Sequence, residues 1–278
     1  MKILTLLIAT LIVMFSPIDS NDSKLRKHLK KGFAEIPAGT MNFEGKRYSF
    51  ESFFIYKTEL SNLEYKEYLA WKGELNKSKV NQISSSKEQD LQASYINHPA
   101  FNDFPVNNIS YEEAEAYCEW LRNMLSKNFE VDKEKILVSL PSRSQWIYAA
   151  KGGHDENVYG WNGPYLRNAE GKFLANFKKE ISQELISYDA KSKTYVVKSE
   201  LAKTSHLRFS ACTSFLPNDF GLYNMSGNVS EFTKENDQVY IMGGSYDSPG
   251  YDIRIDKGVK SKEANLLTGF RPVVQIRD

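Results

Sequence analysis

The chain has 278 residues, of which 41% are hydrophobic and 26% are charged. This composition is that of a folded globular protein and excludes a chain that is disordered over most of its length. The 36 lysines and arginines nearly balance the 35 aspartates and glutamates, which argues against a nucleic-acid-binding protein.

The first twenty residues predict an export signal. Lys2 precedes a predominantly apolar run over residues 3–15, and polar residues follow from Asp19. This is the pattern of a secretory signal peptide, and the run is shorter than the roughly 20 apolar residues that span a bilayer. We therefore expect an exported protein. Residues 1–20 are then a signal peptide or an uncleaved anchor, and we expect no other transmembrane segment.

The next segment, residues 21–32, is rich in lysine and predicts a linker or a frayed helix. A single domain over residues 33–278 is expected to follow it. Residues 36–58 have the pattern of strand, turn and strand, with Gly45 at the turn. Residues 74–91 are polar and rich in serine, and predict a long surface loop.

Three helices are predicted from their start signals. Each begins with a serine that is followed three residues later by Glu or Gln, which is the capping-box pattern: Ser61 and Glu64, Ser110 and Glu113, Ser142 and Gln145. The second helix should face the core with the residues that recur at helical spacing, which are Ala114, Tyr117, Cys118, Leu121 and Leu125.

The second half of the chain predicts loops and short strands. Gly152 and Gly153 should stop the third helix, and no helical periodicity follows them. Strands are expected over residues 239–242 and 270–276, with a tight turn or bulge at Gly243 and Gly244. The predicted class is therefore α+β.

The two cysteines, Cys118 and Cys212, predict a buried apolar side chain and a strand residue, respectively. An oxidising compartment would allow them to pair, and the sequence leaves this open. The four histidines do not have the spacing of a zinc or iron site.

One loop has the composition of a calcium site. The side chains of Asn224 and Glu231 and the carbonyls of Gly227 and Val229 would supply four oxygens around a glycine turn, and calcium prefers oxygen ligands. The alternative is an ordinary polar turn.

Ten short motifs then appear in order along the chain, at residues 36–40 (IPAGT), 98–106 (HPAFNDFPV), 117–121 (YCEWL), 140–150 (LPSRSQWIYAA), 160–163 (GWNG), 175–177 (ANF), 217–224 (PNDFGLYN), 227–229 (GNV), 243–246 (GGSY) and 269–271 (GFR). Together they resemble the formylglycine-generating enzyme, or sulfatase-modifying factor, superfamily. The resemblance covers practically the whole chain after the export segment. It implies a loop-rich α+β fold that is a variant of the C-type lectin architecture.

The resemblance also implies site residues. It supports structural calcium at Asn224, Gly227, Val229 and Glu231. A second, more doubtful calcium site would use Asn176 and the carbonyl of Phe177, but the expected downstream aspartate is not evident near residues 204–206. The residues that would line the family's cleft are Trp161, Ser245, Tyr246, Asp247, Ser248 and Arg271.

The chain departs from the oxidase branch at one decisive place. That branch has two copper-binding cysteines after the GGSY motif, since thiolates select copper. Here the corresponding positions hold Ser248 and Ile253. Cysteine-dependent formylglycine formation is therefore excluded, and no copper is expected.

Residues 98–106 and 163–177 most resemble the gliding-motility lipoproteins of Bacteroidetes, which serve type IX secretion. This similarity predicts a scaffold or binding component in the periplasm or cell envelope of a Gram-negative bacterium. It would be a pseudoenzyme whose partners are envelope or secretion-machinery proteins. No lipidation cysteine is present. The alternatives are a non-thiol oxidoreductase of the same superfamily and a lectin-like ligand-binding protein.

Overall fold

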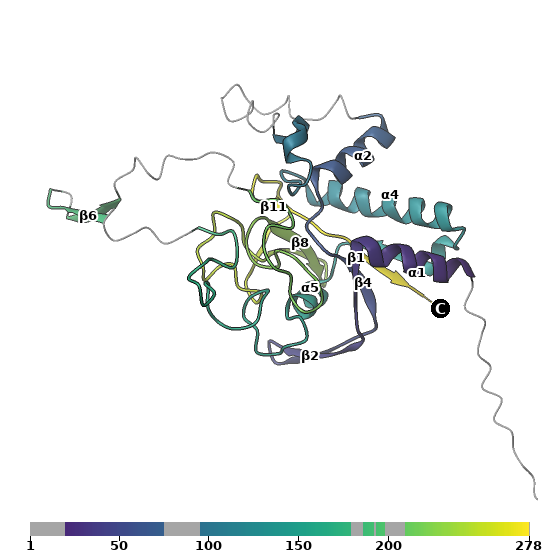
Figure 1. Ribbon diagram of the computed structural model, residues 1–278, viewed down its shortest axis with the longest axis horizontal. Coiled ribbons are helices and arrows are strands. Elements are labelled where there is room, and N and C mark those ends of the chain that lie inside the picture. Colours follow the sequence, from purple (N-terminus) through teal and green to yellow (C-terminus); the bar gives the residue numbers. More distant parts are fainter. Residues whose placement is uncertain (1–19, 75–94, 179–185, 192, 198–208, 278) are drawn as a thin grey trace, which may run out of the picture.

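The computed structural model describes residues 20–74, 95–178, 186–191, 193–197 and 209–277. The described part combines a few helices with short strands and long irregular connections (Figure 1). This confirms the predicted α+β class. Among the described helices, none is both long enough and apolar enough to cross a bilayer.

Four strands form the first sheet, in the order β1-β4-β12-β5. They are β1 (Phe33–Ile36), β4 (Phe53–Tyr56), β12 (Val273–Ile276) and β5 (Ile136–Ser139), and every pairing is antiparallel. The carboxyl-terminal strand β12 thus lies between strands from the first half of the domain. A separate hairpin of β2 (Gly39–Phe43) and β3 (Lys46–Phe50) extends from this sheet, and Gly45 has a φ of 74° at its turn.

The second sheet has the order β10-β9-β8-β11. It contains β8 (Ser230–Glu235), β9 (Gln238–Met242), β10 (Gly258–Lys260) and β11 (Thr268–Gly269). The pairing of β8 with β11 is parallel, and the others are antiparallel. A third antiparallel pair, β6 (Ile186–Asp189) with β7 (Thr194–Val197), projects away from the rest of the molecule (Figure 1).

All three predicted helix starts are confirmed. The helices α2 (Asn62–Lys72), α4 (Tyr111–Phe129) and α5 (Arg143–Ala150) each begin after a capping box in which the serine side chain and the Glu or Gln side chain satisfy two backbone N–H groups. Short 3₁₀ turns lie at Pro99–Phe101 and Lys133–Lys135. After α5, the described residues contain no further helix.

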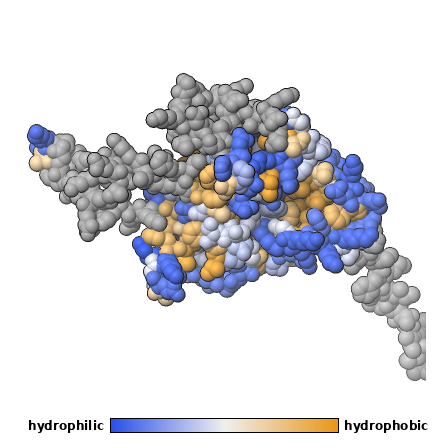
Figure 2. Space-filling model, turned by 45° about the horizontal axis from the view of Figure 1, so that its top comes forward, coloured by the Kyte–Doolittle hydropathy of each residue, from blue (hydrophilic) through white to orange (hydrophobic). Residues whose placement is uncertain are grey.

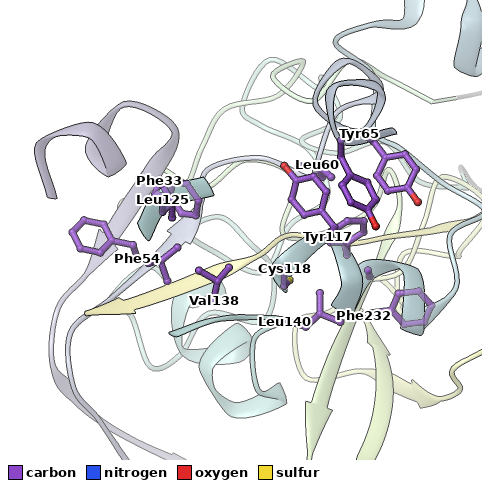
Figure 3. Close-up of a cluster of buried hydrophobic side chains, with 14 of the residues drawn as sticks. Phe33, Phe54, Leu60, Tyr65, Tyr117, Cys118, Leu125, Val138, Leu140 and Phe232 are labelled. Atoms are coloured by element: carbon purple, nitrogen blue, oxygen red, sulfur yellow. The ribbon is translucent and has the colours of Figure 1, made fainter. Parts of the chain in front are cut away.

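Helix α4 carries the largest core cluster on its buried face (Figure 3). Tyr117, Cys118 and Leu125 point into it, together with Phe54 and Val138 from the first sheet. Tyr117 packs edge-on against Phe270, with ring centroids 5.5 Å apart. The helix therefore joins the sheet to the segment that carries the motif of residues 269–271.

Residues 21–32, for which the sequence predicts a linker or a frayed helix, are helical, but the helix is packed on the core rather than frayed. These residues form helix α1 (Ser20–Gly32), which lies alongside α4 and β1 and buries Leu25 and Leu29 completely (Figure 1). The high lysine content concealed a short apolar stripe of two leucines spaced four residues apart. The packed domain consequently begins before Phe33. The predicted loop at residues 74–91 lies almost entirely outside the described residues.

We expect the Leu29→Ala substitution to lower the free energy of unfolding by about 2–5 kcal/mol, because it leaves a cavity under α1. The matched change Lys27→Ala, on the exposed side of the same helix, should change it by less than about 0.5 kcal/mol. Urea unfolding followed by circular dichroism measures both values. Equal, small effects would show that α1 does not pack on the core.

Candidate functional site

The segment after β9 leaves the second sheet through two glycines with left-handed backbone. Gly243 has a φ of 80° and Gly244 a φ of 64°. A Cβ atom on Gly243 would lie 3.1 Å from the Trp146 ring, and one on Gly244 would lie 2.9 Å from the Asp252 carbonyl oxygen. Glycine is therefore required at both positions, for conformation and for space.

Ser245 to Ser248 form a tight turn in which the Ser248 hydroxyl is already engaged. The backbone N–H of Ser248 donates to the Ser245 carbonyl at 3.0 Å, and the backbone N–H of Ser245 donates to the Ser248 Oγ at 2.9 Å. Asp247 pairs with Lys178 at 3.2 Å on the outside of the turn. Ser248, at the position where the resemblance implies the first cysteine, thus stabilises the turn.

Ile253 stands at the position where the resemblance implies the second cysteine, and its side chain is apolar. It is completely buried and belongs to a small core cluster with Tyr159, Ala175 and Phe177. Neither position therefore offers a nucleophile or a metal ligand of the thiolate type.

The two cysteines of the chain do not replace the missing pair. Cys118 lies in the α4 core and Cys212 lies in a turn, so the expectation of a strand at Cys212 is wrong. Both are free and buried. Burial raises the pKa of each thiol above its usual value. Both are therefore neutral thiols at physiological pH, which are poor nucleophiles and poor metal ligands.

The remaining predicted cleft residues make different contacts. Ser245, Asp247 and Ser248 share the turn, and the Tyr246 ring packs edge-on against Phe209 at 4.8 Å. Trp161 instead stacks on Tyr159 with ring centroids 4.8 Å apart, and its Nε1 donates to the Tyr165 carbonyl at 2.9 Å. Arg271 does not line a cleft, because its side chain is fully buried.

Arg271 is the centre of a buried polar cluster. Its Nε donates to Glu231 Oε2 at 2.7 Å and its Nη2 to Glu231 Oε1 at 2.6 Å, which makes a bidentate ion pair. The other N–H groups donate to the carbonyls of Tyr56, Lys57 and Tyr223 at 2.9–3.2 Å. All five guanidinium donors are therefore satisfied.

Two further buried groups complete this cluster. The Trp146 Nε1 donates to Glu231 Oε2 at 2.8 Å. Glu59 accepts from the side-chain amides of Asn228 at 2.8 Å and Asn224 at 3.0 Å. Sequence reasoning missed both Glu59 and Trp146, although Glu59 stands two residues before the first capping box.

The charge balance of the cluster shifts the pKa of Glu59. Burial raises this pKa from 4.5 to about 7, Arg271 opposes the shift, and the nearby carboxylate of Glu231 adds to it. Two buried carboxylates face a single buried arginine, so the second carboxylate has no counter-charge of its own among the described residues. Glu59 is therefore the proton-binding member of the cluster.

The donor set does not fit calcium as predicted. The carboxylate of Glu231 already receives three N–H donors from Arg271 and Trp146. An ion there would have to displace a buried cation from its counter-ion, at a cost of several kcal/mol. Among the described residues, no group of three or more His, Cys, Asp or Glu side chains is placed to hold a metal. We therefore assign Glu231 to the ion pair.

The second predicted calcium position is part of the same polar region. The side-chain amide of Asn176 donates to Asn228 Oδ1 at 3.1 Å, and the backbone carbonyl of Asn176 accepts from the backbone N–H of Asn228 at 2.7 Å. Phe177 is buried beside Ile253. The region at 204–206, where an aspartate ligand was sought, lies outside the described residues.

The family follows from a comparison with known sequences. Residues 23–276 match the sulfatase-modifying factor enzyme 1-like domain. The chain belongs to this family. The match starts within α1, in agreement with the packing of that helix on the core.

Relatives of both kinds, inactive and active, are similar to this family member. The inactive C-alpha-formylglycine-generating enzyme 2 of Bos taurus is 26% identical over 157 residues, which cover 56% of this chain and 38% of the relative. The formylglycine-generating enzyme of Mus musculus is 25% identical over 142 residues, which cover 48% of this chain and 28% of the relative. The chain thus spans less than two fifths of these relatives. These similarities alone do not distinguish an active from an inactive member, so that distinction has to rest on the residues at the site.

Solved structures support the family fold. CarF superimposes with a TM-score of 0.58 at 19% identity and covers 89% of this chain and 98% of its own. PvdO from Pseudomonas aeruginosa gives a TM-score of 0.54 at 17% identity, with coverages of 88% and 94%. At these identities the similarity establishes the fold alone.

Arg271→Met should lower the free energy of unfolding by about 3–5 kcal/mol, since it leaves the buried Glu231 carboxylate without its partner. Lys133→Met, which breaks the exposed pair with Glu119, should cost less than about 1 kcal/mol. Guanidinium unfolding of both variants gives the two values. Similar losses would contradict the central position of Arg271.

Glu59 should make the stability depend on pH. The pKa of Glu59 is higher in the fold than in the unfolded chain, so its contribution is complete below pH 4.5 and is lost as the pH rises through about 7. This loss amounts to up to about 3 kcal/mol. In Glu59→Gln it should be absent. Parallel pH profiles of the unfolding free energy for the two proteins would refute the assignment.

Calcium should have little effect on the stability of this protein, because Glu231 is held by Arg271. We expect melting temperatures within about 1 °C of each other in 5-fold molar excess of calcium and in excess chelator, whereas a ligand present at 100 times its Kd would add about 2.7 kcal/mol. A calcium-dependent increase of several degrees that disappears in Glu231→Gln would restore the predicted site.

Proposed function

We propose that this family member is a non-catalytic binding or scaffolding component of the bacterial cell envelope. One observation carries the proposal: the two positions where the oxidase branch has cysteines hold a turn-forming Ser248 and a buried Ile253. The similarity to an inactive relative supports it. The protein then works through its surface rather than through a reaction.

The exported location and the partners are part of the same proposal. The apolar run at residues 3–15 supports export to the periplasm. The motifs at residues 98–106 and 163–177 support an association with gliding or type IX secretion machinery through the sequence resemblance described above. Envelope proteins of that machinery are the partners we propose.

The exposed residues Tyr165 and Tyr251, near the core cluster that contains Ile253, are a suitable contact region, which we call the aromatic surface over Ile253. Trp161 donates to the Tyr165 carbonyl, and Leu166 lies against Gly250. Tyr165 and Tyr251, the residues next to this contact, are 75% and 59% exposed. Exposed tyrosines contribute strongly to protein interfaces because they bury a large rigid ring and still hydrogen-bond.

The test is a mild cross-linking capture of the tagged chain from envelope fractions of its own host, followed by mass spectrometry. We expect stoichiometric recovery of secretion or gliding components, and a loss of at least tenfold for the double change Tyr165→Ala and Tyr251→Ala. The double change Leu63→Ala and Leu216→Ala, at exposed residues elsewhere, serves as the matched control. A partnerless monomer would contradict the proposal and would favour a ligand-binding or oxidoreductase role instead.

A further inference from the structure

Helix α1 carries an unusual concentration of positive charge for this chain. Its 13 residues include five lysines and arginines but one acidic residue, Asp22, whereas the whole protein has a net charge of only +1. The helix has a net charge of +4, since 5 − 1 = 4, so the rest of the chain is net negative.

The packing of α1 fixes where this charge points. Leu25 and Leu29 are completely buried and hold one side of the helix on the core. Lys24, Lys27 and Lys31, at i, i+3 and i+7, are exposed on another side. Helix α1 lies at the right-hand side of the molecule in Figure 1, and this side carries hydrophilic side chains in Figure 2. The three lysines therefore form a fixed cationic face, which we call the α1 lysine face.

A structural role does not account for this face. Lys30 pairs with Glu35 at 2.9 Å, but within the described part of the chain Lys24, Lys27 and Lys31 form no ion pair with a carboxylate. Lys31 in the last turn is favourable for the helix dipole, but Lys24 and Lys27 lie outside that turn. Like charges three and four residues apart repel one another. The face thus lowers helix stability unless an anion lies against it.

The sequence next to α1 indicates what that anion is. The apolar run at residues 3–15 ends five residues before Ser20, and five extended residues span at most about 17 Å. Apolar residues of this kind partition into a bilayer, so any such contact brings α1 to the headgroups. Clusters of lysine next to an apolar segment bind anionic lipids, and the attraction acts over a Debye length of about 8 Å.

We propose that the α1 lysine face binds the anionic headgroups of a phospholipid bilayer and orients the domain on that surface. The opposite, leucine-bearing side of α1 stays on the core. The remainder of the domain, including the aromatic surface over Ile253, is then presented at a fixed orientation to partners. Each lysine should contribute about fivefold to the preference for anionic over neutral lipid.

The test is flotation of the full chain with vesicles of phosphatidylcholine alone and of phosphatidylcholine with 30% phosphatidylglycerol. The ratio of the two partition coefficients isolates the charge effect, because the apolar run contributes to both. We expect Lys24→Gln, Lys27→Gln and Lys31→Gln together to lower this ratio by up to about 100-fold. The preference of the unmodified chain should vanish in 1 M salt, where the Debye length is about 3 Å.

The matched control replaces three exposed lysines elsewhere, Lys46, Lys172 and Lys260, with Gln, and should leave the ratio within twofold. An unchanged melting temperature shows that both triple variants fold. An equal loss in both variants, or no preference for the anionic vesicles in the unmodified chain, would overturn the proposal. Tighter binding of the same face to duplex DNA than to the anionic vesicles would also overturn it.

Discussion

The bidentate ion pair between Arg271 and Glu231 connects the parts of this structure that the chain itself does not keep together. Arg271 precedes β12 of the first sheet, and Glu231 lies in β8 of the second sheet. The same guanidinium donates to two carbonyls at the end of β4, and Glu231 accepts from Trp146 of α5. A loop-rich fold with short strands has few long ladders to fix its parts. A fully satisfied buried network compensates because each member has one allowed arrangement.

This network lies next to the turn at which the family resemblance implies the first cysteine of the oxidase branch. Gly243 packs on the Trp146 ring, and the turn from Ser245 to Ser248 follows at once. At the two positions where the family resemblance implies cysteines, Ser248 stabilises the turn and Ile253 fills the core, so both residues fit the fold. The proposed function depends on what the outer surface contacts.

Local signals predicted the helices and the glycine turns well. Each of the three predicted capping boxes starts a helix, because the two reciprocal hydrogen bonds need only residues three apart. Gly243 and Gly244 adopt the left-handed backbone that only glycine accepts readily. The family motifs predicted the fold correctly.

The sequence could not reveal relationships between distant residues. Helix α1 has only two buried leucines, and its lysines gave the pattern of a linker. Glu231 was assigned to calcium from the composition of its loop and from the resemblance. Its partner Arg271 is 40 residues away and belongs to no local pattern that includes Glu231. Glu59 has no local pattern at all, since its amide partners are more than 160 residues away. Only the folded chain brings these groups together.

The measurement that tests the central claim most directly is mass spectrometry of a cysteine-containing sulfatase-type peptide after incubation with the purified chain, copper and oxygen. The formylglycine-generating enzyme of Mus musculus serves as the active control. A non-catalytic member leaves the peptide cysteine unchanged. Conversion of that cysteine to formylglycine above the level of a copper-only blank would contradict the account, because neither Ser248 nor Ile253 can supply a thiolate.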